Sequence, residues 1–163
     1  MATGDADLVW RLMSEISHCM LIYHDGKAMR ARPMSGSVDR EKNAVWFLVG
    51  AGLRDDLEKT DGKVCLSFVD DVQSVFLSVS GSSEFSSDAE LTAEVRGKVS
   101  QRWHGELAHE TAEIGTLRVT PVIAEYWRHP TTELMIALDA LASGATHMVD
   151  GAAGVTGRVD LTV

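Results

Sequence analysis

Two short segments carry arginines in settings that suit the binding of an anion. Arg30 and Arg32 lie two residues apart in a stretch with strand character, so both side chains point to the same face. Arg54 follows the turn 50–53, whose two glycines join an apolar run to a short helical segment. Backbone amides at a helix start attract anions, and a guanidinium offers donors that match a phosphate. We predict anion binding at these segments; a solvated strand face and an ordinary helix start are the alternatives.

The turn before Arg54 also carries features that oppose a phosphate. Asp55 and Asp56 fall in the first helical turn, where carboxylates complement the helix dipole but repel a phosphate dianion. Residues 50–55 begin like a dinucleotide-binding fingerprint, but Asp55 stands in place of the third glycine and the helix that follows is short. We therefore reject a Rossmann fold and attribute the glycines to the turn.

Other site chemistries lack their residues. Six scattered histidines show no H-E-x-x-H spacing, and Cys19 and Cys65 lie in apolar strand-like runs without a C-x-x-C pair, so we predict no metal site and reduced thiols. No G-x-S-x-G elbow or Walker loop is present, and no side chain stands out as an acid, a base or a nucleophile. We therefore predict no catalytic residue. Four tryptophans could stack on a planar ring, although each singly is expected in the core: Trp10, Trp46, Trp103 and Trp127.

The apolar periodicity indicates the elements that must position these residues. Strands are predicted at 19–23, 28–38, 44–49, 64–68, 75–79 and 115–127. Helices are predicted near 8–16, at 53–60, from a capping box at Ser87–Glu90 to near Trp103, and at 134–141. Asp25-Gly26 favours a tight type I′ hairpin. Pro33 cannot donate to a sheet, which indicates a bulge or an unpaired edge. These six strands, mostly joined by hairpins or short helices, favour a compact antiparallel barrel.

Length and composition indicate one globular domain over residues 1–163. Hydrophobic residues make up 45% and charged residues 24% of the chain, as in ordinary globular proteins. The Gly- and Ala-rich tail 145–163 ends in an alternating stretch that is expected to add an edge strand or reach a partner subunit.

The net charge of the chain limits the kinds of partner that it is expected to bind. The net charge of −9 opposes binding to nucleic acid and to anionic membranes. The longest apolar runs are only strand-sized, and Asp5 and Asp7 stand where a secretory signal carries basic residues. We expect a cytoplasmic protein.

The order of several short motifs resembles a known family. The motifs are Met20–Ile22 before Asp25-Gly26, Arg-Ala-Arg-Pro-Met at 30–34, Ala-Val-Trp-Phe at 44–47, Val-Ser-Gly at 79–81, Leu-Arg-Val-Thr-Pro at 117–121 and Glu-Tyr-Trp at 125–127. Together they resemble the bacterial general stress proteins related to pyridoxamine phosphate oxidase. The likeness runs from about Leu8 to Leu141.

The resemblance implies a six-stranded antiparallel split β-barrel that works as a homodimer and holds FMN at the subunit interface. It places Arg32, Pro33 and Met34 along the flavin; Phe47, Leu48 and Val49 beneath it; the phosphate near Arg54; and Trp103 and Trp127 near the pocket. The chain departs from the family at three phosphate-donor positions, where it carries Val49, Leu53 and Asp55.

The function that this resemblance implies is that of an FMN-dependent, oxidoreductase-like stress protein, in which the flavin performs the redox chemistry. Two alternatives stay open at this point. The chain could be a non-catalytic module that binds flavin or another small anion. It could also be a barrel dimer without a cofactor.

Overall fold

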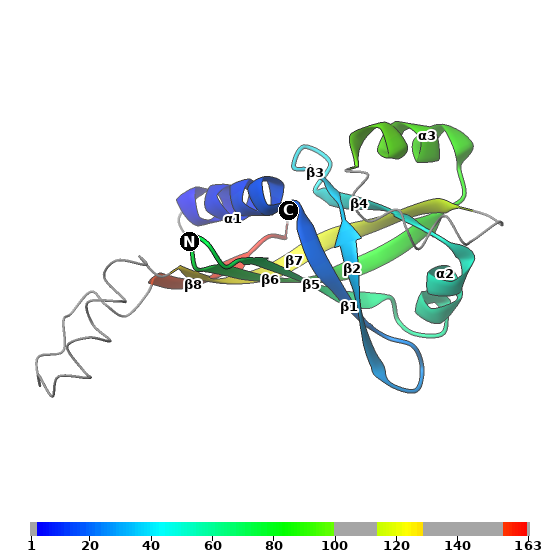
Figure 1. The fold of residues 1–163 in the computed structure, drawn as a ribbon, viewed down its shortest axis with the longest axis horizontal. Helices are drawn as coiled ribbons and strands as arrows, with labels where there is room; N and C mark the ends of the chain where they lie inside the picture. Colours follow the sequence, from blue (N-terminus) through cyan, green and yellow to red (C-terminus); the bar gives the residue numbers. More distant parts are fainter. Residues whose placement is uncertain (1–2, 100–113, 129–154, 163) are drawn as a thin grey trace, which may run out of the picture.

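A computed structural model of the chain describes residues 3–99, 114–128 and 155–162 (Figure 1). The helices are α1 (Thr3–Ile16), α2 (Ala51–Glu58) and α3 (Ala89–Lys98). The strands are β1 (His18–His24), β2 (Met29–Ser35), β3 (Ser37–Asp39), β4 (Ala44–Val49), β5 (Lys63–Asp70), β6 (Val75–Ser86), β7 (Gly115–Arg128) and β8 (Val155–Asp160).

All eight strands belong to one antiparallel sheet. Its order is β2-β1-β5-β6-β7-β4-β3, and β8 pairs with β7. Strand β7 is 14 residues long, so one edge of it can hold two partners in succession. Its first part pairs with β4 at 115–119, and its last part pairs with β8 at 123–128.

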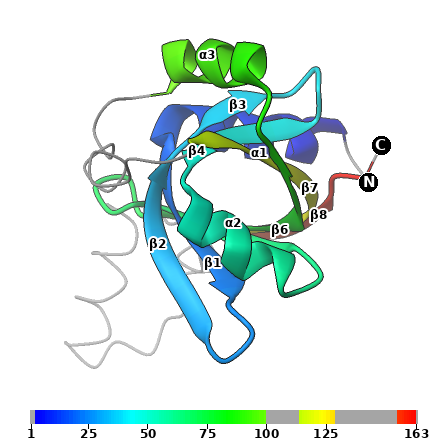
Figure 2. The same cartoon turned by 90° about the vertical axis from the view of Figure 1, so that its right-hand side faces the viewer.

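The sheet curls because its two ends are neighbours in the chain. Only Gly36 separates β2, at one end of the strand order, from β3, at the other. A Cβ atom on Gly36 would lie 2.7 Å from the Phe47 ring, so glycine lets the chain pass close to β4 here. Figure 2 shows the resulting barrel nearly end-on, with α2 in front of its opening.

The barrel interior is the main core. Alternate residues of β1, β5 and β6 point inward and are almost fully buried: Cys19, Leu21, Tyr23, Val64, Leu66, Phe68, Val75, Leu77 and Val79. Helix α1 adds Val9 and Met13 to the same cluster, and α2 adds Leu53 and Leu57. Both helices therefore pack their apolar sides on the barrel, as the predicted amphipathic helix near residues 8–16 requires.

The curled antiparallel sheet is confirmed, but the described residues form eight strands and not six. The predicted strand 28–38 is interrupted at Gly36, which gives β2 and β3, and the tail contributes β8. The expected edge strand therefore exists, at Val155–Asp160. Pro33 lies in β2, which pairs only with β1 in the part of the chain that the structure describes, so the predicted edge position is confirmed.

Two local predictions need correction. The N-cap of α3 is Asp88, not Ser87, because the Asp88 carboxylate accepts hydrogen bonds from the Glu90 and Leu91 amides. The helix ends at Lys98, before the predicted position near Trp103, since Val99 is extended. Trp103 itself and the predicted helix 134–141 lie outside the described residues.

The β1–β2 hairpin forms as predicted but with a different turn. The Asp25 amide donates to the Ala28 carbonyl, so Gly26 and Lys27 are the central residues. Only Gly26 has a positive φ, of 96°, whereas a type I′ turn needs two such residues. The Asp25 carboxylate instead accepts from the Lys27 and Ala28 amides.

Candidate functional site

Two strand edges and one helix frame the opening of the barrel. Strand β3 pairs with β4 only at 44–46, so among the described residues the remaining edge of β4, at 47–49, has no strand partner on that side. The edge of β2 that faces away from β1 has none either. Helix α2 covers the end of the barrel that faces the viewer in Figure 2 and packs Leu53 and Leu57 on the core. A flat ligand with hydrogen-bonding edges suits such a split, because unpaired strand edges present backbone donors and acceptors.

Arg32 points into the barrel side of the split. It lies opposite Leu21 in the sheet register, while Arg30 lies opposite Tyr23, so both share the inner face. The Arg32 guanidinium lies over the Tyr23 ring, 5.9 Å from its centroid. Arg30 pairs with Asp25 at 3.9 Å, whereas Arg32 forms no ion pair with any described residue. Arg32 is thus the inward-facing cation that a ligand could engage.

Tyr23 is a candidate residue that sequence reasoning missed. Its side chain is 1% exposed, and its hydroxyl has no hydrogen bond of normal geometry among the described residues, although the Arg32 guanidinium is close enough to favour the ionised phenol. Burial raises the pKa of Tyr23 above its ordinary value; the Arg32 charge opposes this rise and the Asp56 charge adds to it. The alternation of Cys19, Leu21 and Tyr23 could have indicated an inward phenol.

A second unpartnered hydroxyl lies on the same strand pair. Ser35 Oγ is buried without a partner at the far end of β2. Ser35 shares the face of β2 that carries Pro33, whereas Tyr23 points to the inner face with Arg32, so the two hydroxyls lie on opposite faces of this strand pair. Buried polar groups are normally hydrogen-bonded, and an unmet one indicates a missing ligand or water.

The start of α2 differs from the prediction: the helix begins at Ala51 rather than at 53, so Asp55 and Asp56 lie beyond its first turn. The Nε and Nη2 atoms of Arg54 each lie 3.1 Å from Asp55 Oδ1. The same guanidinium stacks 5.5 Å from the Phe85 ring centroid and lines a pocket of about 210 Å³ that also involves Leu117. Asp56, two residues on and so on the other side of the helix, pairs with Lys59 at 3.6 Å and acts on Tyr23.

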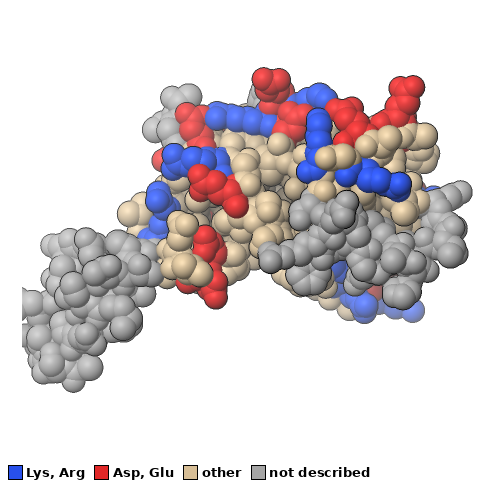
Figure 3. All heavy atoms as spheres, turned by 45° about the horizontal axis from the view of Figure 1, so that its top comes forward, with Lys and Arg blue, Asp and Glu red and all other residues tan. Residues whose placement is uncertain are grey.

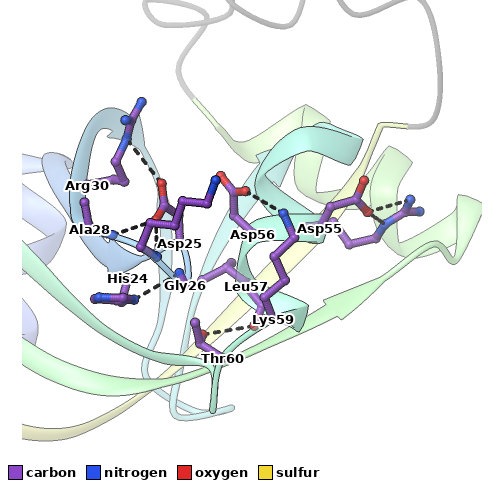
Figure 4. A network of polar contacts seen from close by, with 12 residues as sticks. His24, Asp25, Gly26, Ala28, Arg30, Asp55, Asp56, Leu57, Lys59 and Thr60 are labelled. Carbon is purple, nitrogen blue, oxygen red and sulfur yellow. Dashed lines mark hydrogen bonds and ion pairs between the residues drawn. The ribbon is translucent and has the colours of Figure 1, made fainter.

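Arg32 and Arg54 therefore lie toward different sides of helix α2, which itself carries Arg54. Figure 4 shows Asp56 toward the β1–β2 hairpin that carries Arg30, and Asp55 on the side away from it. Arg32 belongs to the hairpin side through Tyr23, and Arg54 to the side of β6 through Phe85. The structure does not bring Arg32 and Arg54 together on one side of α2.

The remaining predicted residues fall in three settings. Phe47 and Val49 point into the core, at 0% and 2% exposure, and Leu48 points outward and packs on α3, so this segment can offer a ligand its backbone but little of its side chains. Pro33 lies opposite Met20 and Met34 opposite Cys19, on opposite faces of β2. Trp127 is 37% exposed on the outer face of β7.

The outer face of the sheet holds a second cavity, of about 410 Å³. Its lining is largely apolar and comes from β1, β2, β5, β6 and β7: Ile22, Met29, Lys63, Val64, Cys65, Ser80, Gly81, Ser82, Val122 and Ile123. Nearby, Val69, Phe76 and Trp127 lie side by side across three strands and are all more than one-third exposed. We call the surface formed by this cavity lining together with Met20, Val69, Phe76 and Trp127 the outer apolar face.

Charged side chains collect elsewhere. On the face that bears α1 and α3, Lys and Arg lie beside Asp and Glu (Figure 3). Ion pairs there include Lys98 with Glu94 at 3.0 Å and Lys42 with Asp39 at 3.8 Å. The described residues on this face therefore form no extended basic surface of the kind that binds nucleic acid.

Two other kinds of site are absent from the described residues. No group of three or more His, Cys, Asp or Glu side chains could hold a metal ion. None of the three helices there is long and apolar enough to cross a membrane.

The residues fit one end of an FMN molecule and not the other. The unpaired edges of β2 and β4, with Arg32 and the Tyr23 hydroxyl on the inner face, suit the polar edges of a flavin ring. At the start of α2, however, Val49 and Leu53 are buried apolar side chains and Asp55 is a carboxylate that already holds Arg54. This turn does not fit a phosphate dianion, because it adds negative charge and few side-chain donors.

Comparison with known proteins identifies the family. The family model described as "Pyridoxamine 5'-phosphate oxidase like" matches residues 5–150. The chain belongs to this family. No curated protein matches it significantly.

Solved structures share the fold of this family member at low sequence identity. A Clostridium acetobutylicum protein related to general stress protein 26 is 18% identical over 79% of this chain and 92% of its own, with a TM-score of 0.61. The general stress FMN/FAD binding protein of Xanthomonas citri is 18% identical over 78% and 90%, with a TM-score of 0.59. A heme binding protein from Mycobacterium smegmatis is 11% identical over 99% and 60%, with a TM-score of 0.63.

Proposed function

We propose that this protein binds a flavin of the FMN class in the split between β2 and β4 and serves as an oxidoreductase-like stress protein. The observation that carries the proposal is the inward-facing Arg32, which forms no ion pair with any described residue and lies over the ring of the buried Tyr23, 5.9 Å from its centroid. Family membership and the likeness to an FMN/FAD binding protein support the same ligand class.

Each part of the split has a distinct task in this proposal. Arg32 and the Tyr23 hydroxyl hold the electronegative edge of the ring, where a guanidinium and a phenol both donate. The backbone of 47–49 supports the opposite edge, and Met34 supplies apolar contact. A bound flavin supplies the redox chemistry. No described side chain is placed as an acid or base, so the chain's own contribution is to bind, orient and shield the ring.

We propose further that two copies associate through the outer apolar face. A chain with a net charge of −9 repels its own copy unless the contact surface is nearly uncharged. Ile22, Cys65, Ser80 and Ile123 lie side by side across this face and carry no charge, and the charged residues beside them, Lys63 and Glu125, have opposite signs. A homodimer built in this way would bring Trp127 of one copy toward the partner and complete a flavin site at the interface.

A competing function is favoured by one contact. Because Asp55 occupies Arg54, the chain could bind flavin too weakly to act as a standing flavoenzyme and could instead be a non-catalytic flavin-binding module. A titration followed by addition of a nicotinamide donor separates the two functions. Binding with bleaching of the flavin absorbance supports the oxidoreductase, whereas binding without reduction supports the module.

The test of the site itself uses Tyr23→Phe. Removing an orphaned buried hydroxyl should leave the free protein equally stable or more stable, by up to about 1 kcal/mol, because an unmet donor carries a desolvation cost. The same change should weaken flavin binding severalfold, as measured by fluorescence titration. Tyr126→Phe, at another buried tyrosine of the inner face, is the matched control. Equal flavin affinity in both variants and the parent would remove Tyr23 from the site, and no binding by any of them would end the proposal.

A further inference from the structure

We propose that the site selects a flavin whose tail ends without a phosphate, so that riboflavin binds more tightly than FMN. This inference rests on the proposed flavin-binding function and narrows its ligand class. It follows from the difference between the two sides of α2.

The tail side of the split repels a terminal dianion. Arg54 is the basic residue within α2, and two of its guanidinium nitrogens lie 3.1 Å from Asp55 Oδ1. A phosphate must displace this carboxylate or accept its negative charge as a neighbour. In the first case the Arg54–Asp55 contacts are lost, and in the second two like charges meet within a few ångströms.

Nothing else in the turn replaces that cation. Val49 and Leu53 are each 2% exposed and contribute apolar packing to the core. Asp56 adds a second carboxylate, which Lys59 meets at 3.6 Å on the far side of the helix. A neutral ribityl chain with hydroxyl groups meets none of these charge conflicts, because hydroxyls can donate to Asp55 as well as accept from a backbone amide.

The hairpin side suits a neutral ring edge better than a phosphate. Arg32 and the unpartnered Tyr23 hydroxyl form one donor pair there, and the Asp56 charge acts on the same tyrosine. Two donors beside a carboxylate match a carbonyl or an imide edge, which carries partial charge only. A dianion at this position would face Asp56 on α2 and Asp25 on the hairpin, which already pairs with Arg30.

The experiment compares riboflavin and FMN on the same protein preparations. Each ligand is titrated into the parent chain, into Asp55→Asn and into Asp71→Asn, with flavin fluorescence as the readout at low and at moderate ionic strength. Asp71→Asn is the matched control, since it removes the same charge from the exposed β5–β6 turn. Circular dichroism spectra establish that all three proteins are folded.

We expect the parent to bind riboflavin about tenfold more tightly than FMN, the effect of one close like-charge contact. Asp55→Asn should strengthen FMN binding by about the same factor, because it removes a negative charge beside Arg54. Riboflavin binding should change much less, because the amide oxygen of asparagine still accepts from a ribityl hydroxyl. Added salt should reduce the difference between the two ligands in the parent. Asp71→Asn should behave as the parent does.

The failures are distinguishable. If the parent binds FMN more tightly than riboflavin, the inference is overturned while the flavin-binding function stands. An FMN-to-riboflavin ratio that Asp55→Asn leaves unchanged would show that the turn does not face the tail, which also overturns the inference. If neither flavin binds any of the three folded proteins, the proposed function itself is wrong.

Discussion

The two faces of the same strands differ in a way that the fold of one chain does not explain. Phe68 on β5 and Phe76 on β6 are the same residue type on adjacent strands, yet their exposed fractions are 1% and 42%. Phe68 points into the barrel with Leu66 and Leu77, while Phe76 points outward between Val69 and Trp127. The inner face is accounted for by folding, because burial of apolar area stabilises the barrel. The outer face calls for a second surface to cover it.

The sharpest test of this comparison is truncation of the two phenylalanines. Phe68→Ala should lower the free energy of unfolding by about 3–5 kcal/mol, because it leaves a cavity in a packed core. Phe76→Ala should cost about 1 kcal/mol or less when unfolding is measured with urea at concentrations where the chain is monomeric. Similar losses at both positions would mean that the outer face is also packed within one chain.

The two cysteines extend the comparison to chemistry. Burial raises the pKa of the Cys19 thiol to about 12 from an ordinary 9.0, with a smaller contribution from Cys65. This rise lowers the thiolate fraction of Cys19 about a thousandfold near pH 8. Cys65 is only partly buried and lines the outer cavity. We therefore expect iodoacetamide to label one thiol per native chain, as measured by mass spectrometry.

The control for that labelling is Cys65→Ser, which should abolish it in the native state and leave one reactive thiol after unfolding. Labelling of the parent should also slow as protein concentration rises, if a second copy covers the outer cavity. Equal labelling of Cys19 and Cys65 would contradict the difference between the faces.

Much of the inner face could be predicted from the sequence, because period-two alternation in the segments around 64–68 and 75–79 marks one buried side. The barrel and the edge position of Pro33 followed from the same pattern and from turn chemistry. Alternation also leaves Val69 and Phe76 on the opposite side, but it does not say whether water or another chain covers them.

The site was less predictable, since it depends on register and on the orientation of one short helix. Tyr23 meets Arg32 because the hairpin turns at Gly26 and Lys27, a one-residue difference from the predicted turn. The sequence places Arg54 and Asp55 next to each other but does not show that the two side chains pair with each other. The break at Gly36, which creates the split, comes from its close approach to Phe47, a contact between segments that are not adjacent in the chain.

Association is tested by placing a charge on the outer apolar face. Phe76→Asp should weaken self-association at least tenfold, as measured by sedimentation velocity, because a buried unpaired carboxylate opposes contact. Val72→Asp, at an 82% exposed residue of the β5–β6 turn, is the control and should leave the association constant unchanged. If both variants associate as the parent does, the second copy docks elsewhere.

The smallest expected effect is on the pH dependence of stability and lies at Asp25 in the β1–β2 hairpin turn. We call this turn the rim, because it lies at the edge shared by the inner and outer faces of the sheet. Hydrogen bonds from the Ala28 and Lys27 amides, aided by Arg30, lower the pKa of Asp25. A carboxyl with a lowered pKa in the folded state stabilises the fold above its unfolded pKa, and this contribution is lost as the pH falls through the folded value.

Asp25→Asn keeps an oxygen acceptor for the turn but cannot titrate. Its urea midpoint should therefore lie slightly below that of the parent at pH 6, and the gap should narrow as the pH approaches 3. Asp71→Asn, on a turn remote from the split, should follow the parent over the same range. A gap that stays constant with pH would mean that Asp25 acts through turn geometry alone, and the rim would then contribute no charge-dependent stability to either face.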